Sequence, residues 1–165
     1  QFCLLNLFKP NLDIREAQIQ DTENLFKLFN DKEVREQSFS NSVIEWDKHL
    51  EWFKDKVKID DCLLFVIHSK VIFLGQVRFD INPDEKSAVI NISLAKYARN
   101  LGLGSFIIKD SLDKLRDHRK INTVKAYIKD GNLRSIKAFE KAGFVYSENT
   151  YKNSCQAKLY LKEVG

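Results

Sequence analysis

The segment from Ile92 to Ser105 constrains the fold of this chain more than any other part of its sequence. An apolar strand-type run ends there, a short loop follows, and Gly102 and Gly104 open an amphipathic helix. Glycine allows the backbone to turn sharply and to come close to a ligand. The first N–H groups of a helix lie unpaired at the positive end of its dipole, which is an arrangement that binds phosphate. The segment therefore predicts an α/β protein with a phosphate-bearing ligand at a helix N-terminus.

Two familiar phosphate-binding motifs do not fit this segment. A P-loop needs Gly-Lys-Ser/Thr with wider glycine spacing. A dinucleotide-binding fingerprint needs a small residue where Ile107 stands, inside a βαβ unit near the start of the chain. On these residues alone, a plain glycine-rich turn remains an open alternative.

The composition narrows the class of protein. With 165 residues, of which 44% are hydrophobic and 30% charged, the chain has the size and balance of one globular domain. No apolar run approaches the ~20 residues that cross a bilayer, so we expect no membrane partner. Three widely spaced cysteines indicate neither a metal site nor a disulfide framework, which favours a reducing, cytoplasmic location. The scattered basic residues behind the net charge of +4 suit an anionic small ligand and do not indicate nucleic-acid binding.

The start of the sequence suggests how the chain is organised. It begins with Gln1 and contains no methionine. We interpret residues 1–12 as a linker or tail and residues 13–165 as one domain. On one interpretation this is the C-terminal domain of a longer protein. A processed N-terminus is the alternative.

The spacing of apolar residues predicts the element order βααβββαβαββ. The predicted strands are 14–18, 62–68, 71–80, 87–95, 123–129, 144–147 and 156–162. Three predicted helices follow N-caps at Asp21, Ser42 and Asn132, and Ser42 forms a capping box with Glu45. A fourth predicted helix begins at Leu103. This order indicates helices that cover a mixed, mostly antiparallel sheet.

A second motif lies one helix and one strand after the first. Its residues are Asn132, Ser135, Phe139, Gly143 and Phe144. Together with Arg99-x-x-Gly102-x-Gly104, it resembles the two main motifs of the GNAT superfamily of acyl-CoA-dependent N-acyltransferases. The order of elements matches that fold from about residue 12 to residue 163. The resemblance implies a GNAT-like fold, with helices on both faces of the sheet, and an N-acetyltransferase that uses acetyl-CoA and no metal.

The resemblance also implies where acetyl-CoA binds. Ile92 and Leu94 would offer backbone groups to the pantetheine arm, and Asn132 would contact the arm or the adjoining loop while capping its helix. Ser135 and Phe139 would lie near the thioester. The pyrophosphate would rest on the helix N-terminus, against Arg99, Asn100, Leu101, Gly102, Leu103, Gly104 and Ser105.

In this family a neutral amine attacks the acetyl carbonyl directly. Backbone N–H groups of the fourth strand stabilise the oxyanion, and CoA leaves as a thiol. Many members carry a general-acid tyrosine seven residues after the asparagine, where this chain has Phe139. Tyr97, Tyr127, Tyr146 or a water molecule are the alternatives for this role.

Polar side chains on strand-type segments are candidates for the acceptor site. Asn91 and Ser93 put polar groups on one face of an apolar strand, as part of an acceptor site or as buried hydrogen-bonding groups. Arg78, on the neighbouring strand, faces the same cleft or forms a surface ion pair. His49 lies on an apolar helical stripe, either packed in the core or acting as a base toward an ammonium substrate. Ser93 and His49 are therefore our candidate catalytic residues.

A narrower resemblance concerns the acceptor. It rests on Val34-Arg35-x-x-Ser38-Phe39, Trp46-x-x-His49-Leu50-x-Trp52-Phe53, Gly75-Gln76-Val77-Arg78-Phe79-Asp80 and Ile90-Asn91-Ile92-Ser93-Leu94. These segments resemble acetyltransferases of bacterial nonulosonic (pseudaminic-acid-type) sugar synthesis, which acetylate the 4-amino group of a UDP-linked deoxy aminosugar. Some of those enzymes follow a UDP-sugar hydrolase domain, a possible upstream partner here. The residues that would shape a sugar-nucleotide cleft are Arg35, Trp46, His49, Arg78, Asn91 and Ser93.

Two other functions stay open at this point. One is a protein N-terminal acetyltransferase of the ribosomal-protein type, whose N-terminal half is similar. The other is a non-catalytic acyl-CoA-binding module, which the phenylalanine at the usual tyrosine position allows. For all of these functions, we expect the protein to be a monomer or a homodimer.

Overall fold

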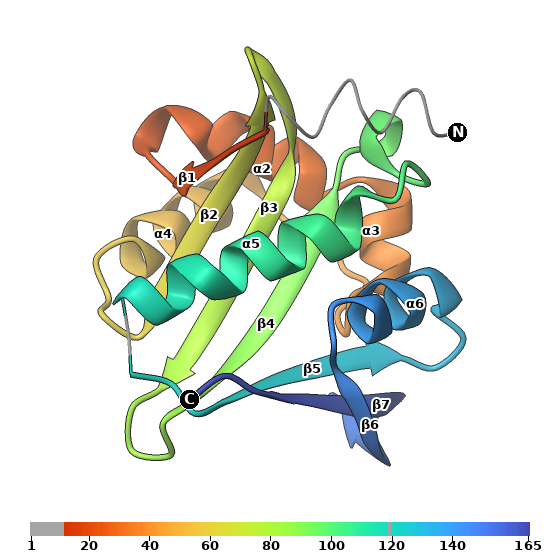
Figure 1. The fold of residues 1–165 in the computed structure, drawn as a ribbon. Helices are drawn as coiled ribbons and strands as arrows, with labels where there is room; N and C mark the ends of the chain where they lie inside the picture. The colour runs from red at the N-terminus through yellow and green to blue at the C-terminus, as the bar shows by residue number, and fades with distance from the viewer. Residues whose placement is uncertain (1–11, 119) are drawn as a thin grey trace.

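A seven-stranded sheet, in the order β1-β2-β3-β4-β5-β7-β6, forms the centre of the molecule (Figure 1). It is seen in a computed structural model, which describes residues 12–118 and 120–165. The strands are β1 (Leu12–Glu16), β2 (Cys62–Ser69), β3 (Ile72–Asn82), β4 (Ser87–Leu94), β5 (Thr123–Lys129), β6 (Val145–Lys152) and β7 (Cys155–Glu163). Neighbouring strands are antiparallel except for the parallel pair β4 and β5. The predicted mixed, mostly antiparallel sheet is confirmed.

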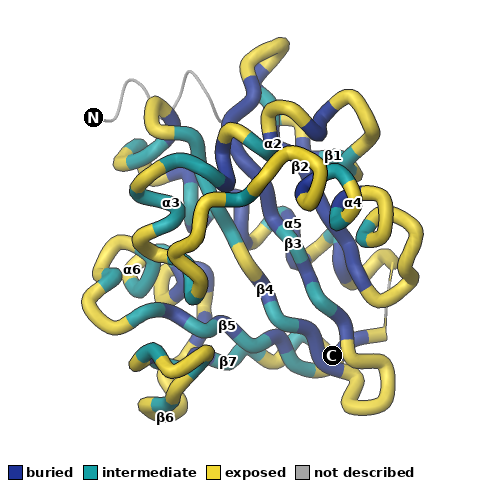
Figure 2. The backbone as a smooth tube through the Cα atoms, turned by 180° about the vertical axis from the view of Figure 1, so that it is seen from behind, coloured by how far each residue is buried: buried dark blue, intermediate teal, exposed yellow. Residues whose placement is uncertain are grey.

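Helices cover both faces of this sheet (Figures 1 and 2). The helices are α2 (Thr22–Phe29), α3 (Lys32–Gln37), α4 (Trp46–Lys56), α5 (Leu103–His118) and α6 (Leu133–Lys141), with short 3-10 turns η2 (Ile19–Asp21) and η3 (Lys96–Ala98). Helices α5 and α6 lie on one face, and α2 and α4 pack on the other. The α/β fold class is therefore confirmed.

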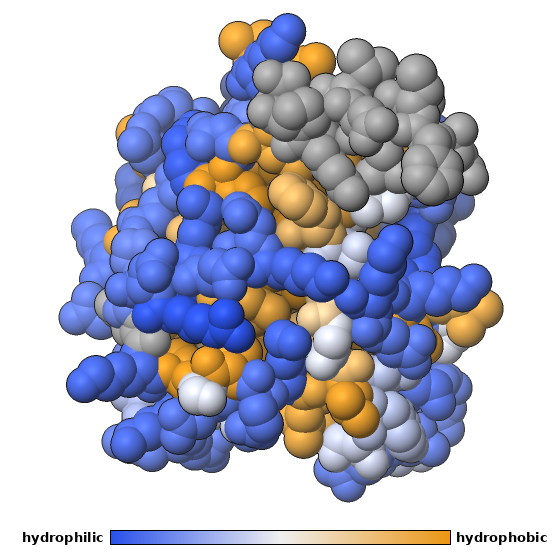
Figure 3. All heavy atoms as spheres, viewed as in Figure 1, coloured by the Kyte–Doolittle hydropathy of each residue, from blue (hydrophilic) through white to orange (hydrophobic). Residues whose placement is uncertain are grey.

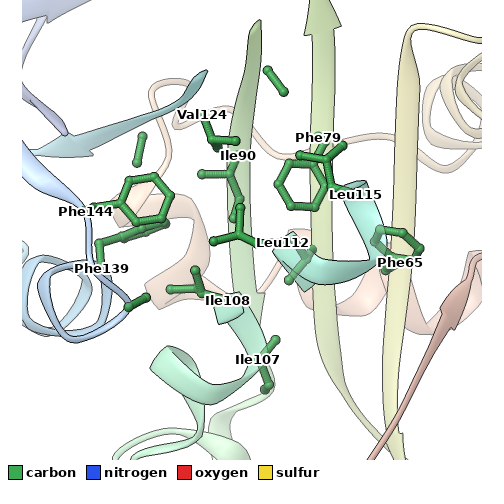
Figure 4. Close-up of a cluster of buried hydrophobic side chains, with 14 of the residues drawn as sticks. Phe65, Phe79, Ile90, Ile107, Ile108, Leu112, Leu115, Val124, Phe139 and Phe144 are labelled. Atoms are coloured by element: carbon green, nitrogen blue, oxygen red, sulfur yellow. The ribbon is translucent and has the colours of Figure 1, made fainter. Parts of the chain in front are cut away.

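The alternation of side chains along β2 produces two hydrophobic cores, one on each face of the sheet. Phe65 and its neighbours two residues away join the larger core under α5, whereas Leu64 and Val66 join the smaller core under α2 and α4. Figure 4 shows the larger core, where side chains of α5 point at the sheet and Phe139 of α6 lies beside Phe144. Burial on both faces explains why β2 is apolar almost throughout.

The parallel pair β4 and β5 stays together over only three residues of each strand. Ser87–Val89 pairs with Thr123–Lys125, and beyond this point the two strands diverge (Figure 1). β4 continues to Leu94 while paired with β3 alone. Among the described residues, the β5-facing backbone groups of the later part of β4 thus have no strand partner. This opening leads to the N-terminus of α5.

Two predicted helix ends are confirmed. The Asn132 side chain accepts a hydrogen bond from the backbone N–H of Ser135 at 3.3 Å, as an N-cap does. Gly143 follows α6 with φ +91°, in the left-handed conformation that ends many helices. Helix α6 therefore begins and ends where its sequence predicts.

The capping box predicted from Ser42 to Glu45 is wrong. Helix α4 begins at Trp46, and Glu45 stands before it with extended backbone and no side-chain cap. The reason lies in α2 and the residue after it, because the Asn30 side chain binds the backbone N–H and C=O of Ile44 at 2.8 and 2.9 Å. These bonds fix the segment outside the helix.

One helix escapes prediction because it buries no side chain. Helix α3 therefore lacks the apolar periodicity on which a sequence prediction depends. Its cap is the Asp31 carboxylate, which accepts a hydrogen bond from Val34 N–H at 3.2 Å. At the start of the chain, Leu12 of the predicted tail already belongs to β1, and residues 1–11 of that tail lie outside the described residues.

The face that carries α5 is mainly hydrophilic, with hydrophobic side chains visible between charged ones (Figure 3). Exposed large hydrophobic residues such as Val71, Leu133 and Tyr151 lie on separate elements. No helix within residues 12–118 and 120–165 is long and apolar enough to cross a membrane.

Candidate active site

A cavity of about 950 Å³ lies where β4 and β5 diverge. One end is lined by the N-terminal residues of α5 and α6, and the other by side chains of α3, α4, β3 and the end of β6. Figure 2 shows from behind how the backbones of β4 and β5 diverge. The cavity thus joins a segment with a phosphate-binding pattern to a wall of polar side chains.

The predicted cofactor residues come together at the first end, with one exception. Those that line the cavity are Ile92, Leu94, Arg99, Asn100, Gly102, Leu103, Gly104, Ser105, Asn132, Ser135 and Phe139. Leu101 does not line it, because its side chain packs against the larger core. Gly102 has φ +70°, and a Cβ at Gly104 would stand 3.3 Å from the Ala138 Cβ, so α5 and α6 approach closely there.

This end fits an extended ligand with phosphate at one end. The unpaired edge of β4 offers backbone groups to such a ligand, as a neighbouring strand would. Glycine at the start of α5 leaves room for a phosphate group near the helix N–H groups. Both features are properties of the backbone.

Arg99 lines the cavity as predicted, and its side chain is bound to other parts of the protein. Its side chain is 8% exposed, and the guanidinium pairs with Asp31 at 2.6 Å and Glu33 at 2.7 Å, while Nε donates to Leu94 O at 2.9 Å. Burial alone raises the pKa of Asp31, but hydrogen bonds from Arg99 and from a backbone N–H outweigh it and lower that pKa. Arg99 therefore fastens α3 to the end of β4.

Glu33 also connects α3 to the second motif. Its carboxylate pairs with Arg134 at the start of α6, and Arg134 donates to the Asn100 side chain at 3.4 Å. One carboxylate thus links α3 to the loop before α5 and to α6.

A row of polar side chains crosses β3 and β4 at the other end. The register pairs Gln76 with Ser93 and Arg78 with Asn91, so these four side chains share one face. Gln76 is fully buried, and its Nε2 donates to Asn91 Oδ1 at 2.8 Å and lies 3.4 Å from Ser93 Oγ. The Asn91 carbonyl is then occupied, which leaves the Asn91 NH2 and the Ser93 O–H to donate into the cavity.

Gln76 was not among the candidate residues. Its sequence signal is a lone amide inside the apolar run of β3, which points to a buried hydrogen-bonding role. Its Oε1 atom is buried without a hydrogen-bond partner among the described residues. Gln76 therefore orients Asn91 and Ser93 through its Nε2 donor, while its own Oε1 stays without a partner.

Arg78 combines the two roles predicted for it. Its Nε donates to Asp80 at 3.0 Å, and the same carboxylate binds Lys56 at 3.1 Å. Its guanidinium lies 5.7 Å from the centre of the Trp52 ring and lines the cavity. Arg78 is thus an ion-paired residue that still faces the cleft.

Trp52, rather than the predicted Trp46, supplies the tryptophan in the cavity wall. Trp46 is 42% exposed and packs edge-to-face on Phe26, with 5.1 Å between ring centres. The two tryptophans stand at different positions around α4. Both rings nevertheless contact the ring of His49, which lies between them in the sequence.

The contacts of His49 favour the packed interpretation over that of a catalytic base. Its side chain is 1% exposed, and Nε2 donates to the backbone oxygen of Thr22 at 2.9 Å. Burial lowers the pKa of His49 and the bond to Thr22 offsets part of this, so the ring is neutral at pH 7. Four aromatic rings surround it, those of Phe26, Phe29, Trp46 and Trp52.

Arg35 lines the cavity as predicted and has no carboxylate partner among the described residues. It donates to the backbone oxygens of Ser40 and Ser42 at 3.2 and 3.4 Å and to Ser38 Oγ at 3.2 Å. Burial lowers its pKa, yet an arginine stays charged, and its Nε is buried without a partner. Its positive charge is available to an anion.

Cations dominate the wall of the cavity. The lining residues with positive charge are Arg35, Lys48, Arg78, Arg99, Lys129, Arg134, Lys137, Lys141 and Lys152. Two carboxylates line it, Glu33 and Asp80, and each is paired with two cations. Such a cavity attracts anions and repels polycations.

One of the three tyrosines considered as general acid reaches the cavity. Tyr127 lines it. The Tyr97 hydroxyl donates to the backbone oxygen of Phe73, and Tyr146 packs on Tyr160 outside the cavity wall. Among these three, the structure therefore leaves Tyr127 as the candidate.

The family is decided by comparison with known domains. The family model described as "Acetyltransferase (GNAT) domain" matches residues 11–145. The chain belongs to the GNAT acetyltransferase family. It is therefore an acetyl-CoA-dependent N-acetyltransferase, and the first of the two predicted resemblances is confirmed.

Individual relatives support the same conclusion. Acetyltransferase PseH of Campylobacter jejuni is 25% identical over 137 residues, which cover 81% of this chain and 83% of PseH. The spermidine N-acetyltransferase of Vibrio cholerae, solved with CoA and spermine, has a TM-score of 0.83 at 17% identity and covers 93% of this chain and 96% of its own. RimL, a ribosomal L7/L12 alpha-N-protein acetyltransferase solved with CoA, has a TM-score of 0.82 at 14% identity and covers 93% and 94%. These structures confirm the GNAT fold, and their complexes support acetyl-CoA as co-substrate.

Proposed function

We propose that this GNAT enzyme acetylates the 4-amino group of a UDP-linked deoxy aminosugar. The observation that carries the proposal is the charge of the cavity, whose carboxylates are neutralised and whose cations include the carboxylate-free Arg35. A nucleotide sugar brings a diphosphate to such a cavity, whereas a polyamine or a cationic N-terminus is repelled by it. The likeness to PseH agrees with the resemblance of the acceptor segments to aminosugar acetyltransferases.

In this proposal different residues of the cavity bind different parts of the acceptor. Arg35 and Arg78 bind the diphosphate, and Asn91 and Ser93 donate hydrogen bonds to the sugar and hold its amine beside the thioester. The neutral amine nitrogen attacks the acetyl carbonyl carbon, and backbone N–H groups of β4 stabilise the oxyanion. The C–S bond then breaks, the thiolate of CoA takes a proton, and the nitrogen gives up its extra proton to solvent. Proximity and electrostatic stabilisation supply most of the rate.

The test is thiol release from acetyl-CoA with three acceptors in parallel. These are a UDP-4-amino-4,6-dideoxy sugar, spermidine and a mixture of short peptides. We expect turnover with the sugar, and at least about 100-fold lower kcat/KM with spermidine, because the cavity opposes a polycation. Turnover with the peptides alone would make the chain an N-terminal acetyltransferase and overturn the proposal.

A further inference from the structure

Lys152 holds a fixed place at the rim of the cavity. It is the last residue of β6, and Asn153 and Ser154 form the tight turn to β7 with φ +47° and +63°. Two successive residues with positive φ are the mark of a type I′ hairpin turn, which leaves little freedom to the strand ends. Lys152 and Asn153 both line the cavity.

The ammonium of Lys152 rests on aromatic rings instead of a carboxylate. Its Nζ lies 4.4 Å from the centre of the Tyr127 ring and 5.6 Å from that of Phe39. No carboxylate of the described residues forms an ion pair with it. Burial lowers the pKa of Lys152, the negative charge of Asp80 raises it, and the positive charge of Arg78 lowers it, while Arg78 and Asp80 line the same cavity.

Other lysines of the same part of the sheet have partners. Lys125 pairs with Glu85 at 3.1 Å and Lys158 with Asp130 at 3.5 Å. Lys152 differs because its ammonium group lies on two aromatic rings, which accept no N–H hydrogen bond of the ordinary kind. Its N–H donors can therefore bind an anionic ligand. Asp80 acts on Lys152 electrostatically but is already paired with Lys56 and Arg78. An anion that binds beside Lys152 therefore offsets the cost of burying its charge.

We propose that Lys152 and Arg78 form an anion subsite that binds a phosphate group of the acceptor between β6 and β3. This subsite rests on the proposed function. It adds Lys152, on the β6 side of the cavity, to the predicted acceptor-binding residues. Tyr127 and Phe39 position the ammonium. The enzyme would thereby recognise a phosphate group of the acceptor at a distance from the reacting amine.

The experiment compares Lys152→Gln, Lys152→Arg and the control Lys158→Gln. Lys158 lies on the same hairpin, 5.7 Å from the Tyr146 ring, and does not line the cavity. The probe is UDP, measured by calorimetry, together with KM for the UDP-aminosugar and for acetyl-CoA. We expect Lys152→Gln to weaken UDP binding and to raise the KM for the sugar by about 10- to 100-fold, with an unchanged KM for acetyl-CoA. Lys152→Arg should recover most of the loss, and Lys158→Gln should behave as wild type.

The outcomes separate the subsite from the proposed function. If UDP binds in a Lys152-dependent way and the aminosugar is not acetylated, the subsite stands and the acceptor is another phosphate-bearing amine. If the aminosugar is acetylated and Lys152→Gln leaves its KM unchanged, the subsite is overturned and the function stands. No binding of UDP to the wild type overturns the subsite as well. Circular dichroism and thermal unfolding confirm that each variant is folded.

Discussion

The two ends of the cavity are built from different parts of the chain. The cofactor end uses the backbone of one contiguous segment, from Ile92 to Ser105, with the helix capped by Asn132. The acceptor end uses side chains from five elements that are distant in sequence, namely Arg35, Trp52, Arg78, Asn91 and Lys152. Backbone geometry can stay constant while side chains change, so we propose that the first end binds the cofactor and the second selects the acceptor.

The largest expected effect tests the backbone character of the cofactor end. Gly102→Leu should weaken acetyl-CoA binding by at least about 100-fold in calorimetry, because a side chain at φ +70° is strained and fills the space before α5. Gly131→Ala is the control, since Gly131 has φ +85° and its Cβ would meet nothing within 4 Å. It shares the strain and should keep its affinity. Tight binding by Gly102→Leu would refute the assignment of the helix terminus.

The next effect concerns the stability of the fold, because Asp21 anchors the turn before α2. Its carboxylate accepts two hydrogen bonds from Arg15, at 2.8 and 2.9 Å, and one from Gln18 N–H at 2.7 Å. Burial by itself raises the pKa of Asp21, but these bonds outweigh it, so the pKa lies below its usual range. The stabilisation is then present above the unfolded-state pKa and is lost as the pH falls through the folded-state value.

We therefore expect Asp21→Asn to lower the free energy of unfolding by about 2 kcal/mol at pH 7, measured in urea. The difference from wild type should shrink below pH of about 4. Asp13→Asn is the control, because Asp13 is exposed on β1 and should change stability little. A difference that persisted unchanged at low pH would show that the carboxylate charge is not what stabilises the turn.

A smaller effect tests whether the acceptor end depends on an orienting side chain. Gln76→Met should raise the KM for the acceptor by about tenfold and leave the KM for acetyl-CoA unchanged, because Asn91 and Ser93 lose their donor. Combined with Ser93→Ala, it should cost less than the sum of the two single changes. Strict additivity would mean that Gln76 does not act through Ser93.

The cofactor end is predictable from sequence because its signal is local. Two glycines after a strand, and an asparagine three residues before a serine, specify a turn and a cap without reference to the rest of the chain. The core positions under α5 follow in the same way from helical spacing. Leu101 does not line the cavity, because a residue inside a motif can still point its side chain at the core.

The acceptor end is not predictable in this way, since its residues meet only in the folded chain. At the cofactor end, the salt bridges of Arg99 also escape prediction, because Asp31 and Glu33 belong to the cap and first turn of α3, a helix with no apolar periodicity. Gln76 becomes visible only once the register of β3 and β4 is known. Lys152 needs the hairpin turn that places it against Tyr127. Sequence patterns specify faces of single elements, whereas these contacts depend on how elements are joined.

The smallest expected effect tests whether protonation of the leaving thiolate, at the cofactor end, limits kcat. Phe139 lines the cavity, is 4% exposed and packs edge-to-face on Phe144, with 5.0 Å between ring centres. Phe139→Tyr restores the hydroxyl that many family members use as general acid. We expect kcat to change by less than about twofold, because we propose that the leaving thiolate takes its proton from Tyr127, which lines the cavity, or from water. The measurement is kcat against pH for Phe139→Tyr, Tyr127→Phe and wild type. An increase of about tenfold or more in the tyrosine variant would mean that protonation of the leaving group limits turnover, so that the cofactor end sets the rate.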